Sequence, residues 1–322
     1  MTATLRRNLG LATALAILLL LAGCTGTRLL LANGIARGGD YRLSADLAYG
    51  DDPRQRLDIY LPAEQLPAQP SSAQPFPEQP PPPRPTLIFV PGGCWGACDT
   101  YPKEDYRFVA DAFTAQGYAV VIPDYRLYPA VKFATIIGDV RDAVEWVAHH
   151  GAQHGLNTDA LVLMGHSAGA QMTALLTLDE SHLSADTHAR LQGYVGLAGP
   201  YDFLPFTKSY QPDLFGPEPL YPASQPVNFV GGDEPPLLLL YGTADTTVKP
   251  RNIQSLTRRV QEQGGAVQAH CYDGIDHGSI VGALARPLQN EAPVYADILA
   301  FLDQIGRPAA IASTPPLQCT AS

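Results

Sequence analysis

Short apolar runs alternate along the chain with longer segments in which apolar residues recur every three or four positions. The runs have the length of buried strands, and the second pattern is that of amphipathic helices. Alternation of the two favours a mostly parallel sheet with helices on its faces. The expected strands are, in chain order, residues 56–60, 86–90, 119–122, 161–164, 194–198, 236–241 and 266–272.

Besides the helical segment that follows the strand at 161–164, three helices are expected between these strands or after the last one. The apolar positions are Ile136, Ile137, Val140, Val144 and Val147 in the first helix, and Ile253, Leu256 and Val260 in the second; the third covers Ala292 to Gln304. The segment Pro200 to Gly232 is rich in proline and aromatic residues and fits no regular pattern. Two interpretations stay open for it: a small cap over a pocket, or a surface loop packed on the core.

The run at 161–164 leads into Gly165-His166-Ser167-Ala168-Gly169, where a helical segment begins. A serine between two glycines at a strand-to-helix turn is the signature of a nucleophile elbow, which exposes the serine hydroxyl in a cleft. The turn is tight enough to favour glycine, which has no Cβ, two positions before and after the serine. We therefore predict that Ser167 is a nucleophile.

A serine nucleophile needs a base, and the base needs an orienting acid, in the chain order serine, acid, histidine. Asp245 follows the strand at 236–241, and His277 follows the strand at 266–272. Because parallel strands end at one edge of a sheet, Ser167, Asp245 and His277 are expected to meet there. His277 would be the general base and acid, and Asp245 would orient its ring.

Other residues compete less well for these roles. His166 lies inside the elbow, where its side chain is expected to point away from the nucleophile, and His270 sits within a strand. Asp273 and Asp276 are alternatives to Asp245 that stay open. The remaining histidines fall on or near polar helix ends: His149, His150, His154, His182 and His188.

An oxyanion site is expected from two places. One is the N–H of Ala168, and the other is the loop Pro91-Gly92-Gly93-Cys94-Trp95-Gly96 after the strand at 86–90. Consecutive glycines let backbone N–H groups turn towards a developing negative charge. Gly92, Gly93, Cys94 and Ala168 are therefore the predicted oxyanion residues.

Together these motifs resemble the α/β-hydrolase superfamily, in its esterase/lipase branch, close to the bacterial carboxylesterase and feruloyl-esterase-like families. Those families carry a Gly-Gly-x-Trp loop, then an Asp-Tyr-Arg-Leu segment, then a helix. Here Gly92-Gly93-Cys94-Trp95 and Asp124-Tyr125-Arg126-Leu127 match, and a helix is expected from near Phe133 to about Val147. The resemblance covers roughly residues 50–305. Pro91 stands where the longer His-Gly-Gly-Gly motif has its histidine, and Arg126 and Asp139 are expected to be structural anchors.

The resemblance implies an α/β-hydrolase fold, with a mostly parallel central sheet flanked by helices. It also implies a carboxylesterase-type serine hydrolase that forms an acyl-enzyme on Ser167 from a small or medium ester, without a cofactor. A metal site is not expected, because Cys94 and Cys98 lack a matching distal Cys/His pair. Two alternatives stay open: an amidase of the arylformamidase type on the same triad, and a non-catalytic envelope lipoprotein that serves as a scaffold.

The N-terminus has the pattern of a lipoprotein signal peptide over residues 1–23. Arg6 and Arg7 precede an apolar run, Leu9 to Leu21, that is too short to span a membrane comfortably. Leu21-Ala22-Gly23-Cys24 resembles a bacterial lipobox, which predicts lipidation of Cys24 and membrane anchoring. Thr25 is not the aspartate of inner-membrane lipoproteins, which favours the outer membrane of the cell envelope, facing the periplasm. An ordinary secretory signal or a short membrane anchor is the alternative.

The rest of the chain is expected to be one large domain, since 46% of the sequence is apolar. We expect an N-terminal segment at 24–49, the hydrolase domain at 50–305 and a tail at 306–322. A stretch rich in proline and glutamine, residues 62–85, is interpreted as an insertion within the domain.

Net charge and cysteine content limit which partners and which cellular compartment are expected. The formal charge is −10, and removal of Arg6 and Arg7 leaves 19 basic against 31 acidic residues, a charge of −12. An acidic chain without a basic stripe argues against nucleic-acid partners. With Cys24 lipidated, four of the five cysteines remain, an even number that suits an oxidising compartment. The pairs Cys94–Cys98, which would stiffen the oxyanion loop, and Cys271–Cys319 are hypotheses. The sequence carries no indication of oligomeric state.

Overall fold

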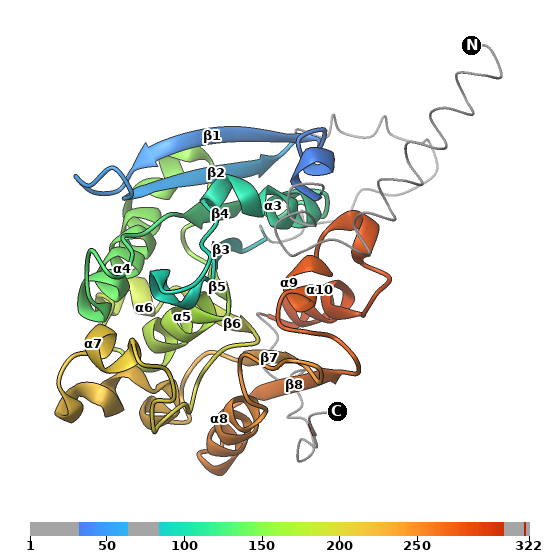
Figure 1. Cartoon of the computed structure of the whole chain (residues 1–322). Coiled ribbons are helices and arrows are strands. Elements are labelled where there is room, and N and C mark those ends of the chain that lie inside the picture. Colours follow the sequence, from blue (N-terminus) through green and yellow to red (C-terminus); the bar gives the residue numbers. More distant parts are fainter. Residues whose placement is uncertain (1–31, 64–83, 306–318, 320–322) are drawn as a thin grey trace, which may run out of the picture.

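A single twisted sheet forms the centre of the molecule (Figure 1). The structure is a computed structural model that describes residues 32–63, 84–305 and 319. Within these residues the strand order is β1-β2-β4-β3-β5-β6-β7-β8. β1 and β2 pair antiparallel, as do β2 and β4, and every later pair is parallel. The strands are β1 (Tyr41–Ala48), β2 (Arg56–Pro62), β3 (Thr86–Val90), β4 (Val120–Pro123), β5 (Leu161–His166), β6 (Leu191–Leu197), β7 (Leu237–Gly242) and β8 (Val267–Tyr272).

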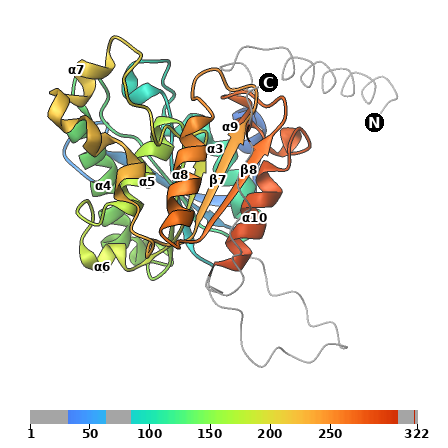
Figure 2. The same ribbon diagram turned by 90° about the horizontal axis from the view of Figure 1, so that it is seen from below.

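Helices cover both faces of the sheet (Figures 1 and 2). Residues 32–36 are helical. The α-helices that follow are α3 (Arg107–Thr114), α4 (Phe133–His150), α5 (Ala168–Leu178), α6 (Ala185–His188), α7 (Gln211–Phe215), α8 (Arg251–Glu262), α9 (Ser279–Gly282) and α10 (Val294–Gln304). The 3₁₀-helices are η1 (Cys94–Gly96), η2 (Lys103–Tyr106), η3 (Gly151–His154), η4 (Glu218–Ser224), η5 (Pro226–Phe229) and η6 (Arg286–Leu288).

Strand β3 shows how one sheet serves two cores. Successive side chains of a strand point to opposite faces. Ile88 and Val90 pack in the core formed with α4, α5 and α8, whereas Leu87 and Phe89 pack in the core formed with α3, α9 and α10. Because both faces are buried, the central strands are almost continuously apolar, which is the pattern that made them predictable from the sequence.

The predicted fold class is confirmed, and each of the seven expected strands is present with ends that differ by up to three residues. The predicted domain start at residue 50 is wrong. β1 lies at 41–48 and pairs with β2, so the sheet begins before that boundary. β1 was not predicted because it is an edge strand whose side chains are mostly exposed. Its sequence therefore lacks the run of apolar residues that marks a buried strand.

Several predictions fall outside the described residues. These are the signal peptide at 1–23, the lipidation of Cys24, residues 64–83 of the proline-rich insertion, and the tail apart from residue 319. Cys319 itself is buried, and its carbonyl oxygen accepts a hydrogen bond from Gln254 Nε2 at 2.6 Å. Among the residues that are described, none of the helices combines the length and the apolar character needed to cross a membrane.

Candidate active site

Three side chains meet at the carboxyl edge of the sheet, as the chain order predicted. Ser167 follows β5, Asp245 follows β7 and His277 follows β8. Ser167 has φ 55° and ψ −123°, a backbone conformation that a non-glycine residue rarely adopts. Such strain is characteristic of a nucleophile held on a sharp strand-to-helix turn.

The two glycines of the elbow are required by close backbone contacts. A Cβ on Gly165 would lie 2.5 Å from the carbonyl carbon of Gly169. A Cβ on Gly169 would lie 2.0 Å from the carbonyl oxygen of Val90, where β3 ends. Both distances are far below van der Waals contact, so the tight turn explains the glycines on either side of Ser167.

Ser167, His277 and Asp245 form one hydrogen-bonded relay. His277 Nε2 lies 2.9 Å from Ser167 Oγ, and His277 Nδ1 lies 2.7 Å from Asp245 Oδ2. A carboxylate can only accept, so Nδ1 carries the proton and Nε2 is left to accept from the serine hydroxyl. The imidazole is therefore held in the tautomer that can remove the Ser167 proton.

The buried carboxylate of Asp245 is held by both of its oxygens. Oδ1 accepts from the backbone N–H groups of Thr247 at 2.7 Å and Val248 at 2.9 Å, which leaves Oδ2 for His277. The two alternatives are engaged elsewhere. Asp276 Oδ1 accepts from Gly278 N and Ser279 N, and Asp273 Oδ1 accepts from the Thr243 hydroxyl. Asp245 is thus the acid that the structure places against His277.

His166 also belongs to this site, contrary to the expectation that its side chain points away from the nucleophile. Its Nε2–H donates to the carbonyl oxygen of His277 at 2.8 Å, and the two imidazole rings lie 4.8 Å apart. Burial, reinforced by the neighbouring His277, lowers the pKa of His166 to about 3, so its ring stays neutral. His166 therefore helps to fix the loop that carries His277. This contact joins residues 111 positions apart, and no sequence motif predicts it.

The predicted oxyanion loop lies directly against the elbow. A Cβ on Gly92 would lie 2.9 Å from Ser167 Cβ. Gly93, Cys94 and Trp95 have φ values of 123°, 49° and 57°, so three successive residues adopt the left-handed region and turn the chain sharply. Ala168 is the first residue of α5, where the helix supplies no acceptor for its N–H. Gly92, Gly93, Cys94 and Ala168 therefore gather around Ser167, and their role as donors stays a prediction.

Two bonds fix the far side of this loop. Trp95 Nε1 donates to Gln171 Oε1 at 3.0 Å, and Gln171 Nε2 donates to the carbonyl oxygen of Ser224 at 2.7 Å. This chain of bonds ties the loop to the nucleophile helix α5 and then to η4. Cys94 and Cys98 form a disulfide across the loop. The other proposed pair, Cys271 and Cys319, is also bonded in the structure.

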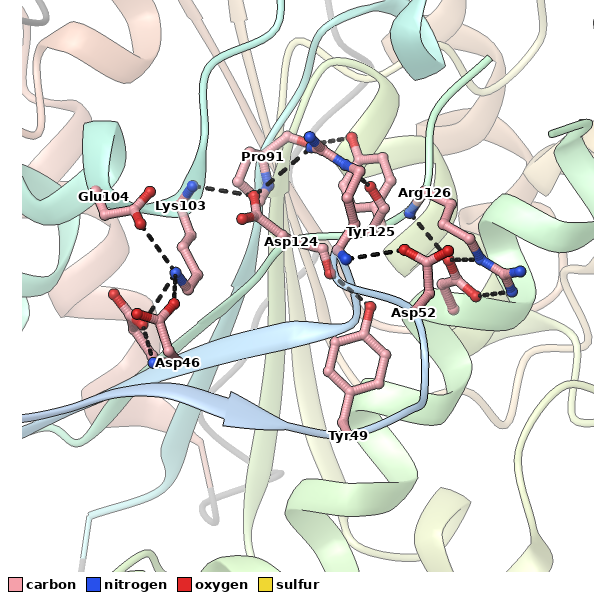
Figure 3. Close-up of polar contacts among 12 residues, drawn as sticks. Asp46, Tyr49, Asp52, Pro91, Lys103, Glu104, Asp124, Tyr125 and Arg126 are labelled. Atoms are coloured by element: carbon pink, nitrogen blue, oxygen red, sulfur yellow. Dashed lines mark hydrogen bonds and ion pairs between the residues drawn. The ribbon is translucent and has the colours of Figure 1, made fainter. Parts of the chain in front are cut away.

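Tyr125 contacts the loop at Pro91, the position where the longer motif has a histidine. The buried Tyr125 hydroxyl donates to the Pro91 carbonyl oxygen at 2.8 Å (Figure 3). Tyr125 is held in turn by Arg54, whose Nε donates to the Tyr125 carbonyl oxygen at 2.8 Å. A tyrosine from the segment after β4 thus supports the start of the oxyanion loop.

The neighbouring residues of that segment are structural anchors, as expected for Arg126 and Asp139. Arg126 Nη2 lies 2.6 Å from Asp139 Oδ1, and the Arg126 N–H donates to Asp139 Oδ2 at 2.9 Å. Asp124 Oδ1 accepts from the Lys103 N–H at 3.1 Å (Figure 3). Neither Arg126 nor Asp139 lines a cavity at Ser167.

Two cavities meet at Ser167. We call the larger one, of about 580 Å³, the aromatic cavity, because Trp95, Phe203 and Tyr210 line it. The other, of about 560 Å³, we call the histidine cavity, because His166 and His277 line it. Both are also lined by Cys94, Cys98, Ser167, Thr246 and Thr247.

The segment 200–232 forms one wall of the aromatic cavity. Phe203 stacks on Trp95 with ring centroids 5.9 Å apart, and Phe215 meets Trp95 edge-on at 5.0 Å. This segment thus has features of both a surface loop packed on the core and a cap over a pocket. Its aromatic residues pack on the core, and residues between Pro200 and Gln211 line the cavity beside the nucleophile. In the part of the chain that the structure describes, no group of three or more metal-ligating side chains occurs.

The chain is similar to a protein family and to several known proteins. The sequence profile of the BD-FAE family matches residues 75–260. The chain is 24% identical to a probable isoprenylcysteine alpha-carbonyl methylesterase of Arabidopsis thaliana, over 72% of this chain and 50% of that protein. It is 26% identical to the esterase LipC of Mycobacterium tuberculosis, over 80% of this chain and 64% of that protein. The chain thus spans half to two thirds of the length of these relatives.

Solved structures share the fold at low sequence identity. Esterase B from Lactobacillus rhamnosis superposes with a TM-score of 0.68 at 19% identity, covering 92% of this chain and 96% of that one. The family profile covers more than half of the present chain, and its span includes β3, the elbow with Ser167, and Asp245. The chain therefore belongs to the BD-FAE family, on an α/β-hydrolase fold.

Proposed function

We propose that this protein is a serine esterase that hydrolyses small or medium carboxylic esters through an acyl-enzyme on Ser167. The relay from Ser167 through His277 to Asp245, with hydrogen bonds of 2.9 and 2.7 Å, carries this proposal. It opens onto two cavities of a size that suits the two halves of an ester. Two of its relatives, a probable methylesterase and an esterase, are named for ester substrates, which supports this proposal.

The geometry supports a two-stage reaction. Ser167 Oγ attacks the ester carbonyl while His277 Nε2 takes the hydroxyl proton, so a bond forms between Oγ and the carbonyl carbon. His277 then gives this proton to the alcohol oxygen as the bond from the carbonyl carbon to that oxygen breaks. Water repeats the sequence on the acyl-enzyme, with His277 as its base, and releases the acid. Asp245 stabilises the imidazolium that forms in each stage.

The oxyanion of each tetrahedral intermediate would be held by backbone N–H groups. Ala168 supplies one from the first turn of α5, where the helix dipole also favours negative charge. The loop with left-handed residues at Gly93 and Cys94 supplies the other. One such donor contributes about 3 kcal/mol of transition-state stabilisation. The contacts of Trp95 and Tyr125 keep this loop in place before the substrate binds.

The direct test is covalent labelling of the purified protein with a fluorophosphonate, together with hydrolysis of p-nitrophenyl esters of increasing acyl length. We expect one label per chain, located on Ser167 by peptide mass mapping, because among the described residues only this hydroxyl is hydrogen-bonded to an imidazole nitrogen that carries no proton. The rate of ester hydrolysis should fall in proportion to the fraction of protein labelled. The matched control is Ser167→Ala, which should fold and bind no label.

Other outcomes would point to the alternatives. Labelling of Ser167 with turnover of aryl formamides but not of esters would favour an amidase on the same relay. Folded protein that takes up no label and turns over neither substrate would contradict the proposed function and favour an envelope scaffold.

We also propose that the mature chain is a lipoprotein of the bacterial cell envelope, anchored through Cys24 to the outer membrane and facing the periplasm. The lipobox pattern Leu21-Ala22-Gly23-Cys24 supports this, and so does the disulfide at Cys94, since disulfides persist in oxidising compartments. We expect the full chain to fractionate with membranes and the Cys24→Ala variant to remain uncleaved and unlipidated. Membrane fractionation checks the first expectation, and intact mass measurement checks cleavage and lipidation. A mature protein without added acyl mass would contradict the anchor.

A further inference from the structure

The chemistry of the relay assigns the two cavities to the two halves of an ester. This assignment rests on the proposed function. His277 must reach the alcohol oxygen to protonate it, so the alcohol lies beside the ring of His277. The histidine cavity is lined by His277, whereas the aromatic cavity is lined by Ser167 and Ala168 and not by His277. The acyl group therefore occupies the aromatic cavity.

The two cavities differ in charge. Lys208, Lys249 and Arg251 line the aromatic cavity, and its lining as described contains no aspartate or glutamate. The histidine cavity has Asp99 and Asp276 instead. This contrast is unusual in a chain with a formal charge of −10, in which acidic residues outnumber basic ones. The described basic side chains at the nucleophile therefore lie on the side of the aromatic cavity.

Within the described parts of the chain, two of these three cations have no acidic partner. Arg251 Nη2 lies 3.2 Å from Asp202 Oδ1, and its Nε donates to the Asp202 carbonyl oxygen. In contrast, Lys208 and Lys249 form no ion pair with any residue that the structure describes. Both lysines are exposed residues of the cavity lining, so solvent and a ligand can reach them.

Backbone hydrogen bonds hold the main chain at each lysine, so each side chain starts from a defined point of the cavity wall. The Lys208 N–H donates to Gln211 Oε1 at 2.8 Å, which holds it in the wall formed by the segment 200–232. The Lys249 carbonyl oxygen accepts from the Asn252 N–H and from Asn252 Nδ2, each at 3.0 Å, at the start of α8. Lys208 and Lys249 thus line the cavity from two different parts of the chain, together with the less exposed Trp95 and Phe203.

We propose that the acyl group of the substrate carries a second, free carboxylate, which Lys208 and Lys249 bind. The substrate class is a half-ester of a dicarboxylic acid, with an apolar spacer along Trp95 and Phe203 between the ester and the carboxylate. A lysine ammonium is a compact charge that suits a carboxylate. Hydrolysis releases the dicarboxylate and the alcohol.

The test compares two esters that differ only at the far end of the acyl chain. These are p-nitrophenyl hexanoate and mono-p-nitrophenyl adipate, with suberate and sebacate half-esters to vary the spacer. We expect the ratio of kcat/KM for the anionic ester to that for the neutral ester to exceed about ten at low salt for the best spacer. The ratio should fall towards one at high salt, because the ammonium groups are exposed and screened.

Variants locate the effect. The double variant Lys208→Gln/Lys249→Gln should lower this ratio about tenfold, and Lys249→Glu should bring it below one. Arg258→Gln is the matched control, because Arg258 is an exposed cation of α8 that lines neither cavity and pairs with Glu262. It changes the net charge by one unit and should leave the ratio as it is.

The outcomes separate this inference from the proposed function. Turnover of the neutral ester with a ratio near or below one for every spacer would overturn the acyl carboxylate and leave the esterase intact. A ratio above ten that persists in the double variant would overturn the role of the two lysines. Absence of turnover on both esters, with no fluorophosphonate label, would overturn the esterase and this inference together.

Discussion

The His277→Asn variant should hydrolyse esters about 10⁴ to 10⁶ times more slowly than the wild type in kcat. The asparagine amide nitrogen can occupy the place of Nδ1 and keep the bond to Asp245, whose side chain is fully buried. It cannot reach Ser167 or accept its proton. The fall in kcat therefore measures the absence of the general base, because the buried Asp245 carboxylate keeps a hydrogen-bond donor.

The three relay residues should also behave as one unit. Without the Ser167 hydroxyl there is no proton for His277 to remove, so loss of His277 as well should not lower kcat further. We expect the double variant Ser167→Ala/His277→Asn to be no slower than Ser167→Ala alone. Steady-state kinetics with an active-site titration of the wild type measures this, and thermal unfolding checks that every variant is folded. Losses that multiply would mean that the two residues act in separate steps, contrary to the relay.

A graded contrast comes from Tyr125→Phe. This variant keeps the ring and removes only the hydroxyl that donates to the Pro91 carbonyl oxygen. Tyr125 is a positioning residue, so we expect a loss of about tenfold in kcat with little change in KM and with labelling of Ser167 preserved. A loss as large as that of His277→Asn would mean that the loop collapses without this bond.

The sequence pattern was sufficient wherever local constraints determine the structure. The apolar run at 86–90 became β3 with the same bounds, and the Gly-x-Ser-x-Gly turn became the elbow, because a buried parallel strand and a tight turn each restrict residue type at neighbouring positions. Chain order then placed Asp245 and His277, since successive parallel strands end at one edge of the sheet.

What the sequence did not predict depends on contacts between distant residues. The bond from His166 to the His277 carbonyl and the support of Pro91 by Tyr125 join elements that approach only in the folded sheet. The helix α3 was also missed, because its short apolar segment follows no motif and gains stability only by packing on the sheet. β1 was missed because an exposed edge strand needs few apolar residues.

The second large effect is expected at Gly169, the glycine that closes the elbow. Gly169→Ala should destabilise the protein by about 3 kcal/mol or more, because the added Cβ would lie 2.0 Å from the Val90 carbonyl oxygen and 2.6 Å from that of Pro91. Both oxygens belong to backbone, at the end of β3 and the start of the oxyanion loop. A backbone atom cannot rotate away as the end of a flexible side chain can, so strand or helix must shift.

Gly138→Ala is the matched control for this substitution. Gly138 lies inside α4, and a Cβ there would meet only Arg141 Nη2, at 3.8 Å. Alanine in a helix interior is more favourable than glycine by about 0.5–1 kcal/mol, so this variant should gain stability. Urea unfolding of the three proteins measures both changes, and a Gly169→Ala protein as stable as the wild type would contradict the close contact between β3 and α5.

The same collision predicts a loss of activity that does not depend on unfolding. Since Pro91 precedes the oxyanion residues Gly92 and Gly93, any shift that relieves the contact with its carbonyl oxygen also moves their N–H groups relative to Ser167. We therefore expect Gly169→Ala to have a lowered kcat even at temperatures where circular dichroism shows it fully folded. Normal kcat in the folded variant would mean that the shift is absorbed by α5, on the side of the helix away from the oxyanion loop.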